Sequence, residues 1–287
     1  MKDYLSLVKF SHTIFALPFA MVGYFLAINL PNQSFEWRTF VLVLLCMVFA
    51  RNAAMAFNRY LDRDIDGKNP RTAVREIPAG ILSAKNVLTF VIFNVIAFIT
   101  TTFFINSICF YLSPVAIAVV LFYSYTKRFT FLCHVVLGLG LSLAPVGAYL
   151  AVTGVFDWIP VLYGASVMLW VAGFDIIYAM QDVEFDLSLG LNSTPVKLGK
   201  KGAMVLSYVF HIICSGLMLL AAFAVTLNYL DAGWLIWTGT GIFIALLIYQ
   251  HSIVSVNDLS RVNIAFFITN GIASVVFGSL LILDLLW

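Results

Sequence analysis

Carboxylates gather at the end of one long apolar run, in the stretch "NRYLDRDID". Asn58, Asp62 and Asp66 recur there at every fourth residue, so on a helix their side chains share one face. Asp64 lies between them and points elsewhere. Ionisable groups placed on an apolar helix are costly and usually mark a functional cavity. We therefore expect this face to line a site for a charged ligand.

A second acidic stripe follows in "DIIYAMQDVEFD". Asp175, Asp182 and Asp186 also share one helical face, Tyr178 lies close to it, and Glu184 is out of phase. Acidic residues often lie at solvated helix ends. That explanation does not account for two sets of carboxylates that each share one helical face at corresponding helix ends. We expect the two stripes to face each other.

The two segments correspond in depth as well. Arg51 precedes Asn58 by the same interval as Asp175 precedes Asp182. Each helix would therefore carry a polar group about 10 Å deeper in the apolar phase than its acidic cluster. Such deep groups favour a cavity inside the protein over a solvated helix end.

Oxygen ligands of this kind suit a hard cation, and Mg²⁺ commonly combines one or two carboxylates with water and substrate phosphate. Facing carboxylates would repel one another, and two divalent cations would cancel their charge. A bound diphosphate would bring roughly three negative charges. Nearby basic residues could offset these negative charges: Arg59, Arg71, Arg75, Lys127 and Arg128. The alternative is that they only follow the positive-inside rule. No His or Cys cluster competes for a softer metal, because both residue types are scattered.

The elements that carry these motifs are long and apolar. Of the 287 residues, 62% are hydrophobic and only 10% are charged, which excludes an ordinary soluble domain and indicates an integral membrane protein. Apolar segments long enough to span a bilayer predict an all-α protein with nine transmembrane helices. The predicted spans are 12–30, 38–58, 86–106, 108–125, 131–152, 158–180, 203–227, 232–251 and 262–285.

Loop charge predicts the orientation. Of the 16 Lys and Arg residues, all but Arg38 and Arg51 fall on one side of the predicted spans. By the positive-inside rule that side is the cytoplasm, which places the N-terminus and both acidic clusters there. Two long polar breaks, about 59–85 and 181–202, follow the clusters and are expected to cover the site.

The motifs together resemble the UbiA-type intramembrane prenyltransferases. The resemblance rests on "NxxxDxxxD" at 58–66, "DxxYAxxDxxxD" at 175–186 and "YSYTKRFT" at 123–130. "NPRTAVREIPAG" and "STPVKLG" fit the same pattern, so the resemblance covers nearly the whole chain. It implies one transmembrane prenyltransferase domain over residues 1–287, with nine helices around a central cavity and a cap formed by the cytoplasmic loops.

The resemblance also assigns roles by position. It implies that Asn58 and Asp62, with Asp66 close by, hold one Mg²⁺ and that Asp182 and Asp186 hold another. Lys127 and Arg128 would contact the diphosphate, and Asp175 and Tyr178 would line the cavity wall. Arg51 and Arg59 would serve substrate binding. Tyr123, Tyr125 and Tyr178 are candidates to shelter an allylic cation.

The acceptor implied by the resemblance is an aromatic acid. Lys9 and His12, in "KFSHTIFALPFA", stand near the positions where hydroxybenzoate enzymes contact the acceptor carboxylate, although this helix departs from their "Arg-x-x-Lys-Pro" pattern. The expected Mg²⁺-dependent reaction transfers a polyprenyl group from its diphosphate to a 4-hydroxybenzoate-like acid in quinone biosynthesis. A naphthoate acceptor of menaquinone synthesis is the alternative.

Two other classes of function remain open. A cation-coupled transporter could use membrane carboxylates, although its site would lie near the bilayer midplane instead of the cytoplasmic helix ends. A membrane scaffold would leave the acidic stripes without a purpose. The expected partners are a polyprenyl diphosphate, an aromatic acid and the lipid of the cell inner or plasma membrane, with no nucleic acid.

Overall fold

Every regular element in the described part of the chain is helical, as the sequence predicts. The computed structural model describes residues 2–8, 15–229 and 232–287. Its elements are α1 (Lys2–Leu7), α2 (Leu17–Ile28), α3 (Trp37–Leu61), α4 (Arg63–Asp66), α5 (Ala84–Phe103), α6 (Ser107–Thr126), α7 (Cys133–Thr153), α8 (Trp158–Ala179), η2 (Met180–Asp182), α9 (Val183–Ser188), α10 (Thr194–Asn228), α11 (Leu235–Ser252), η3 (Ile264–Thr269) and α12 (Asn270–Leu286).

Eight segments in the described ranges are long and apolar enough to cross a membrane. They coincide with the predicted spans from 38–58 onward, so the prediction of a multi-pass membrane protein is confirmed. The remaining apolar helix, α2, has only 12 residues. The predicted span 12–30 starts within 9–14, which lies outside the described ranges. Nine helices are therefore an approximation: eight long spans and a shorter α2.

The predicted span 203–227 corresponds to the part of α10 that follows a kink at Gly199. The helix begins at Thr194, well before the predicted residue 203. Lys197, Lys200 and Lys201 lower the local hydropathy, so an apolar criterion misses a part that is nevertheless helical. Gly199 interrupts this part with φ 68° and ψ 166°, a conformation that glycine tolerates because it has no Cβ.

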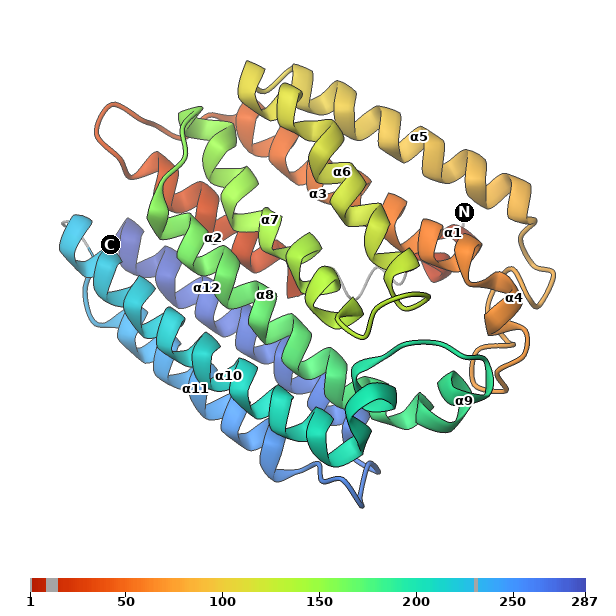
Figure 1. Cartoon of the computed structure of the whole chain (residues 1–287). Helices are drawn as coiled ribbons and strands as arrows, with labels where there is room; N and C mark the ends of the chain where they lie inside the picture. Colours follow the sequence, from red (N-terminus) through yellow and green to blue (C-terminus); the bar gives the residue numbers. More distant parts are fainter. Residues whose placement is uncertain (1, 9–14, 230–231) are drawn as a thin grey trace.

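The long helices lie side by side in one bundle (Figure 1). α7 packs against α8, and α8 packs against α10. α2 packs against both α7 and α12, while α3 pairs with α5 and α6. The helices that carry the acidic motifs, α3 and α8, both pack against α7. This arrangement brings the ends of α3 and α8 to the same end of the bundle.

Aromatic side chains fill the core between α2, α8, α11 and α12. The Trp170 ring lies 5.5 Å from the Phe19 ring and 5.4 Å from the Phe243 ring, measured between centroids. Its indole Nε1 donates to Asn270 Oδ1 at 2.9 Å, so its polar atom is satisfied inside the apolar core. Large apolar side chains such as Phe93 and Ile212 are exposed on the outside of the bundle, where they would face lipid.

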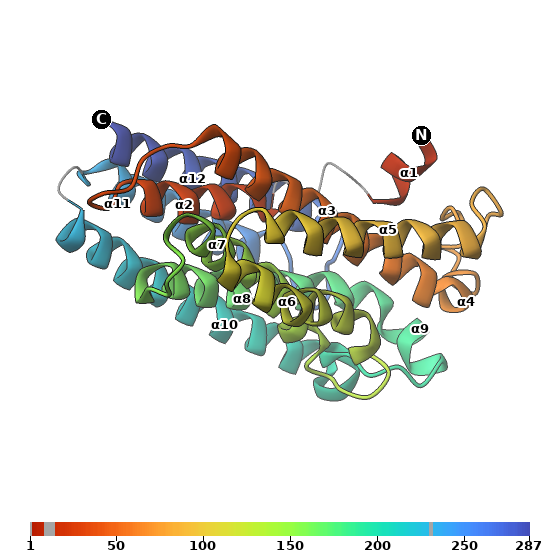
Figure 2. The same cartoon turned by 90° about the horizontal axis from the view of Figure 1, so that it is seen from above.

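The two ends of the bundle differ in their residues. α1, α4 and α9 lie at one end, and the C-terminal end of α12 lies at the other (Figures 1 and 2). Five exposed tryptophans mark this second end, at helix starts or at the chain end: Trp37, Trp158, Trp234, Trp237 and Trp287. Tryptophan is enriched at membrane–water interfaces, so this end is suited to one face of a bilayer.

Candidate active site

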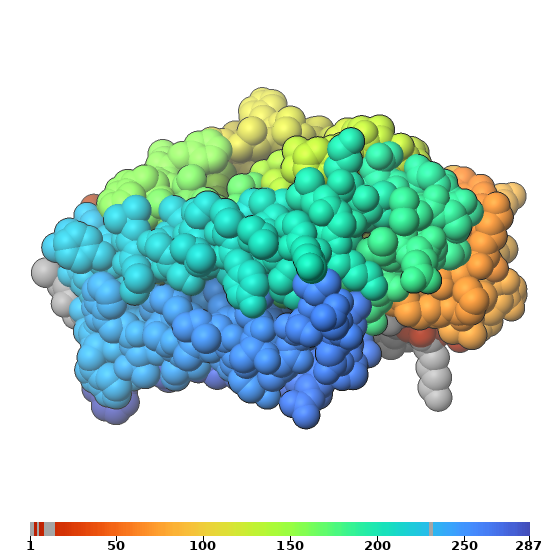
Figure 3. Space-filling view, turned by 60° about the horizontal axis from the view of Figure 1, so that its bottom comes forward, coloured from red at the N-terminus to blue at the C-terminus, as the bar shows by residue number. Residues whose placement is uncertain are grey.

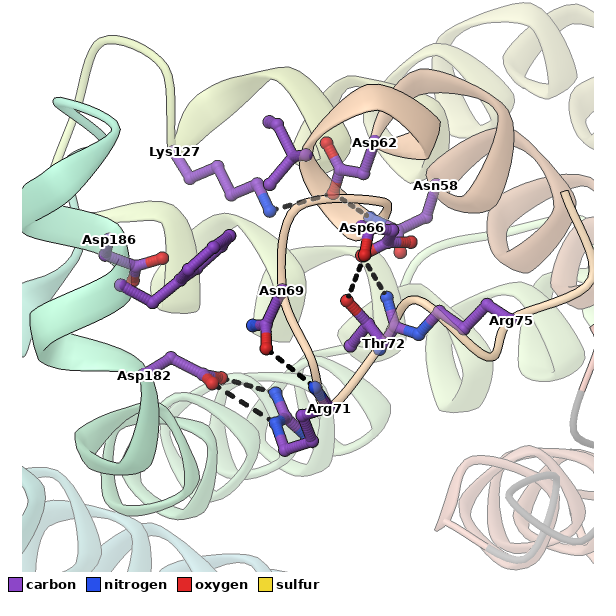
Figure 4. Close-up of a pocket in the computed structure, with 12 residues that line it drawn as sticks. Asn58, Asp62, Asp66, Asn69, Arg71, Thr72, Arg75, Lys127, Asp182 and Asp186 are labelled. Atoms are coloured by element: carbon purple, nitrogen blue, oxygen red, sulfur yellow. Dashed lines mark hydrogen bonds and ion pairs between the residues drawn. The ribbon is translucent and has the colours of Figure 1, made fainter. Parts of the chain in front are cut away.

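The two acidic motifs line one pocket, at the end of the bundle that holds α4 and α9. The segments around them lie next to each other on the molecular surface, at the right of Figure 3. Figure 4 shows the motif side chains turned toward a shared space. The pocket is lined by Asn58, Asp62, Ile65, Asp66, Asn69, Arg71, Thr72, Arg75, Lys127, Asp182, Phe185 and Asp186.

Each motif spans a break in its helix. α3 ends at Leu61, and Asp62, with φ −91° and ψ 5°, leads into the short α4. The backbone N–H of Asp66 still donates to the Asp62 carbonyl at 2.7 Å, so the expected spacing survives the bend. The second motif passes from α8 through the 3₁₀ turn η2, which ends at Asp182, into α9. Both breaks keep their acids facing the pocket.

Asp62 is held by cations from the end of α6. Its side chain is buried, and Lys127 Nζ lies 2.9 Å from Oδ2 while Arg128 Nη2 lies 2.9 Å from Oδ1. Asn58 Nδ2 also donates to Oδ2, at 3.2 Å. Arg128 further donates to the Leu61 carbonyl at 3.1 Å, which ties the end of α3 to the end of α6. The "KR" pair thus stands directly against the first motif.

Asp66 keeps one oxygen free for a ligand. Its Oδ1 accepts from Arg75 Nη1 at 2.6 Å, and its backbone carbonyl accepts from Thr72 Oγ1 at 3.1 Å. Its Oδ2 is buried and has no hydrogen-bond partner among the described residues. A buried carboxylate oxygen without a partner is unfavourable unless something binds it.

Arg71 reaches from the segment after the first motif to the second motif. Its Nε and Nη2 contact the two oxygens of Asp182 at 3.2 and 2.5 Å, a bidentate pair. Its Nη1 donates to the Tyr178 hydroxyl at 3.1 Å. Burial works against the charge, but Asp182 and Tyr178 raise the pKa of the Arg71 guanidinium above its usual value. Arg71 therefore remains a cation at the centre of the pocket.

Some predicted residues lie behind this pocket instead of lining it. Asp175, on α8, pairs with His134 Nδ1 at 2.7 Å. Tyr123, on α6, and Arg51, on α3, are also absent from the pocket lining.

The remaining predicted residues in the described ranges are not part of the pocket lining. Arg59 is buried on α3. Tyr125 is exposed and packs on Phe57, which leaves it poorly placed to shelter a cation inside the protein. Lys9 and His12 lie outside the described residues.

Sequence reasoning missed several pocket residues. Asn69, Thr72 and Phe185 line the pocket, and His134 lies beside it, yet none was predicted. Asn69 and Thr72 stand inside "NPRTAVREIPAG", so the motif that carried the resemblance held a signal for them. His134 ends the stretch "YTKRFTFLCH", which also fits the resemblance, but its pairing with Asp175, 41 positions away, has no local signal.

The donor set fits a hard cation. The five predicted ligands offer carboxylate and amide oxygens, the ligands that Mg²⁺ prefers, and Asp66 Oδ2 is available. In the described ranges, no three acidic, His or Cys side chains already stand together as a cation site. Three of the acids are instead paired with Lys or Arg. A cation at Asp62 would therefore displace basic groups toward an anionic ligand.

Comparison with known families agrees with this arrangement. The model of the UbiA prenyltransferase family matches residues 16–271, most of the chain. The chain belongs to the UbiA prenyltransferase family. The resemblance carried by the two acidic motifs and the Lys-Arg element is therefore confirmed.

Named relatives of this UbiA protein share one designation. A 4-hydroxybenzoate octaprenyltransferase from Saccharophagus degradans is 32% identical over 249 residues, covering 86% of this chain and 81% of that protein. A 4-hydroxybenzoate octaprenyltransferase from Aliivibrio fischeri (strain MJ11) is 32% identical over 168 residues. The chain spans 58% of the length of this second relative.

Solved structures share the UbiA fold. The apo structure of a UbiA homolog from Aeropyrum pernix K1 matches with a TM-score of 0.84 and 33% identity, covering 95% of this chain and 98% of that one. A UbiA homolog from Archaeoglobus fulgidus bound to GPP and Mg²⁺ matches with a TM-score of 0.75. It is 21% identical, covering 99% of this chain and 100% of that one, so it bears on the fold alone.

Proposed function

We propose that this protein transfers a polyprenyl group from a polyprenyl diphosphate to a 4-hydroxybenzoate-like aromatic acid, with Mg²⁺, in quinone biosynthesis. One observation carries the proposal: both acidic motifs and Lys127 line the same pocket. Family membership and the names of the relatives support the same chemistry. We further propose that residues 1–287 act as one domain, with the pocket on the cytoplasmic face of the inner or plasma membrane.

The pocket offers a place for the diphosphate head group. Asn58, Asp62 and Asp66 would hold one Mg²⁺, and Asp182 and Asp186 would hold a second. When bound, the metal supplies positive charge to the diphosphate oxygens on which negative charge builds as the allylic C–O bond breaks. The proposal agrees with the bound GPP and Mg²⁺ of the Archaeoglobus fulgidus homolog.

Basic side chains stabilise the departing diphosphate from the protein side. Lys127 and Arg71 line the pocket, and Arg128 stands against Asp62. Cationic groups aimed at developing negative charge lower the barrier most when they are already in position. The ion pairs with Asp62 and Asp182 keep these groups at the pocket before a ligand arrives, and metal binding to the two acids would release them toward the diphosphate.

The allylic cation needs shelter from water and a π-face. The Tyr178 ring lies 4.2 Å from the Phe266 ring, between centroids, next to the Arg71 contact with Asp182. Aromatic faces attract cations, and Phe185 is a further aromatic residue at this pocket. Arg71 also joins the polar segment after the first motif to the second motif.

A transfer assay tests the proposal. The purified protein in detergent, with Mg²⁺, a polyprenyl diphosphate and 4-hydroxybenzoate, is expected to yield a C-prenylated acid detectable by mass spectrometry. A parallel reaction with a hydroxynaphthoate reports the menaquinone alternative. Chelation of Mg²⁺ by EDTA is expected to stop transfer, and added Mg²⁺ to restore it. Ion flux in proteoliposomes without any prenylated product would establish the transporter instead.

A further inference from the structure

A buried histidine supports the deeper acidic residue of the second motif. His134, at the start of α7, places Nδ1 2.7 Å from Asp175 Oδ2 on α8. His134 is only 5% exposed, and its Nε2 has no hydrogen-bond partner among the described residues. An ionised carboxylate only accepts hydrogen bonds, so Nδ1 carries the proton and donates it.

The pair lies behind the pocket, deeper along α8. Asp175 precedes Asp182 on the same helical face, about 10 Å further from the membrane surface. The Asp175 side chain is 22% exposed, so this deeper layer is open to a ligand. An acceptor bound below the diphosphate would meet this layer.

The contact fixes one carboxylate oxygen and leaves the other available. Among the described residues, no second side chain or backbone group hydrogen-bonds Asp175. With Oδ2 held by the imidazole, Oδ1 is free to accept a proton. A rigid second residue that orients a catalytic group is a common requirement for efficient proton transfer.

We propose that His134 is a positioning residue that orients Asp175 to remove the ring proton from the prenylated acceptor. This inference rests on the proposed transfer to an aromatic acid. The allylic C–O bond breaks with its electron pair on the diphosphate, and a ring π pair forms the new C–C bond. Asp175 Oδ1 then accepts the proton from that ring carbon, and the C–H pair restores aromaticity. His134 keeps its hydrogen bond to Oδ2 throughout.

A matched pair of amides tests the role of Nδ1. In His134→Asn the amide nitrogen falls near the position of the imidazole Nδ1, whereas in His134→Gln it falls near Nε2. Both variants remove the imidazole and keep a polar amide, so they differ mainly in the donor to Asp175. Product formation and pyrophosphate release are measured together, with the KM of each substrate and the melting temperature in detergent.

His134→Gln is expected to lower kcat for prenylated product by about 100-fold, within the range for general acid–base contributions. Pyrophosphate release is expected to fall less, so more of the consumed donor appears as prenyl alcohol, while the donor KM stays within about twofold. His134→Asn is expected to retain at least about a tenth of the wild-type kcat. Asp175→Asn should lose product formation, and adding His134→Gln to it should cost little more.

Three outcomes overturn the inference. Wild-type kcat in His134→Gln means that the contact is irrelevant to proton removal. Equal losses in both amide variants, in parallel with melting temperature and with an unchanged product-to-pyrophosphate ratio, mean that the histidine is structural. A wild-type protein that releases pyrophosphate yet prenylates no aromatic acid overturns the proposed function and this inference with it, a result that is distinct from the first two.

Discussion

Asp62 is the most heavily contacted acid of the pocket. It is buried between Lys127 and Arg128, so removing its charge leaves two cations facing each other without compensation. Breaking a buried ion pair by removing one partner costs about 3–5 kcal/mol when burial is complete. Lys127 and Arg128 are partly exposed, so the cost in free energy of unfolding should be smaller here.

Charge removal at the two motifs is expected to stop turnover. Asp62→Asn and Asp182→Asn keep the side-chain size but lose the anionic oxygen that a hard cation prefers. Each should reduce kcat/KM by more than about 100-fold, which corresponds to roughly 3 kcal/mol of transition-state stabilisation. The measurement is prenylated acid formed per folded protein over a range of Mg²⁺ concentrations.

Asp64→Asn provides the control within the same motif. The Asp64 side chain is 83% exposed and lies outside the pocket lining. It should therefore keep near wild-type activity. Full activity in Asp62→Asn and Asp182→Asn would contradict the metal assignment, and loss of activity in Asp64→Asn would point to general electrostatics instead.

The sequence predicted which acids share a face but not which bases pair with them. Helical periodicity is enough to group Asp62 with Asp66 and Asp182 with Asp186, because it depends on local geometry alone. The contact of Arg71 with Asp182 joins residues 111 positions apart, and His134 meets Asp175 across two helices. Such pairs depend on tertiary packing, which one sequence does not encode in any local pattern.

At the scale of elements, a carboxylate on one helix caps another. Asp284, near the end of α12, accepts from the backbone N–H groups of Gly233 at 3.0 Å, Leu235 at 3.3 Å and Ile236 at 2.9 Å. These groups lie at the start of α11, where helical N–H groups lack intrahelical partners and the dipole favours an anion. Asp284 is 6% exposed, so water does not easily replace it.

Removal of this cap is expected to loosen the α11–α12 pair without touching the site. Asp284→Ala leaves buried N–H groups unsatisfied, at a cost of about 1–3 kcal/mol in the free energy of unfolding. The melting temperature in detergent should fall, while kcat at a permissive temperature should stay near wild type. Asp64→Ala, whose side chain is 83% exposed, is the matched control and should leave the melting temperature nearly unchanged.

Close approach of α2 and α12 depends on a missing Cβ. A Cβ at Gly278 would lie 2.9 Å from Pro18 Cβ and 3.2 Å from the Pro18 carbonyl oxygen. Gly278→Ala is therefore expected to force the helices apart and destabilise the protein by about 1–3 kcal/mol.

Gly241→Ala is the comparison for this packing prediction. Gly241 also lies in a membrane helix, but a Cβ there would meet nothing within 4 Å. Its melting temperature should equal or exceed that of the wild type. Equal melting temperatures for the two alanine variants would contradict the packing argument.

Hydropathy predicted the existence of the long helices better than their ends. Spans such as α5 and α8 have predominantly apolar sequences, and their predicted limits fall within a few residues of the observed ones. α10 differs because its first turns carry lysines and a glycine kink, where helical structure persists without an apolar pattern. Helix ends are set by capping and tertiary contacts, which leave little trace in hydropathy.

At the scale of the whole molecule, the two ends of the bundle differ in their charged and aromatic residues. The acidic pocket and most basic residues lie at one end, and the exposed tryptophans lie at the other. This asymmetry supports the predicted orientation, with the pocket toward the cytoplasm.

Cysteine labelling tests that orientation. In a background without the four native cysteines, Val74→Cys and Val155→Cys place thiols on exposed positions near opposite ends. In intact spheroplasts, a membrane-impermeant maleimide should label Val155→Cys but not Val74→Cys. After permeabilisation both should react. The reverse pattern would place the pocket on the outer face of the membrane.

Cleavage by trypsin after Arg71 can report whether the pocket is occupied. Trypsin cuts after arginine only when the chain around the bond can unfold locally, and this guanidinium is anchored by Asp182 and Tyr178. Binding of pyrophosphate with Mg²⁺ should protect the bond after Arg71, whereas Asp182→Asn should expose it in the absence of ligand. Digestion followed by intact-mass analysis would then follow occupancy without any need for the reaction to proceed.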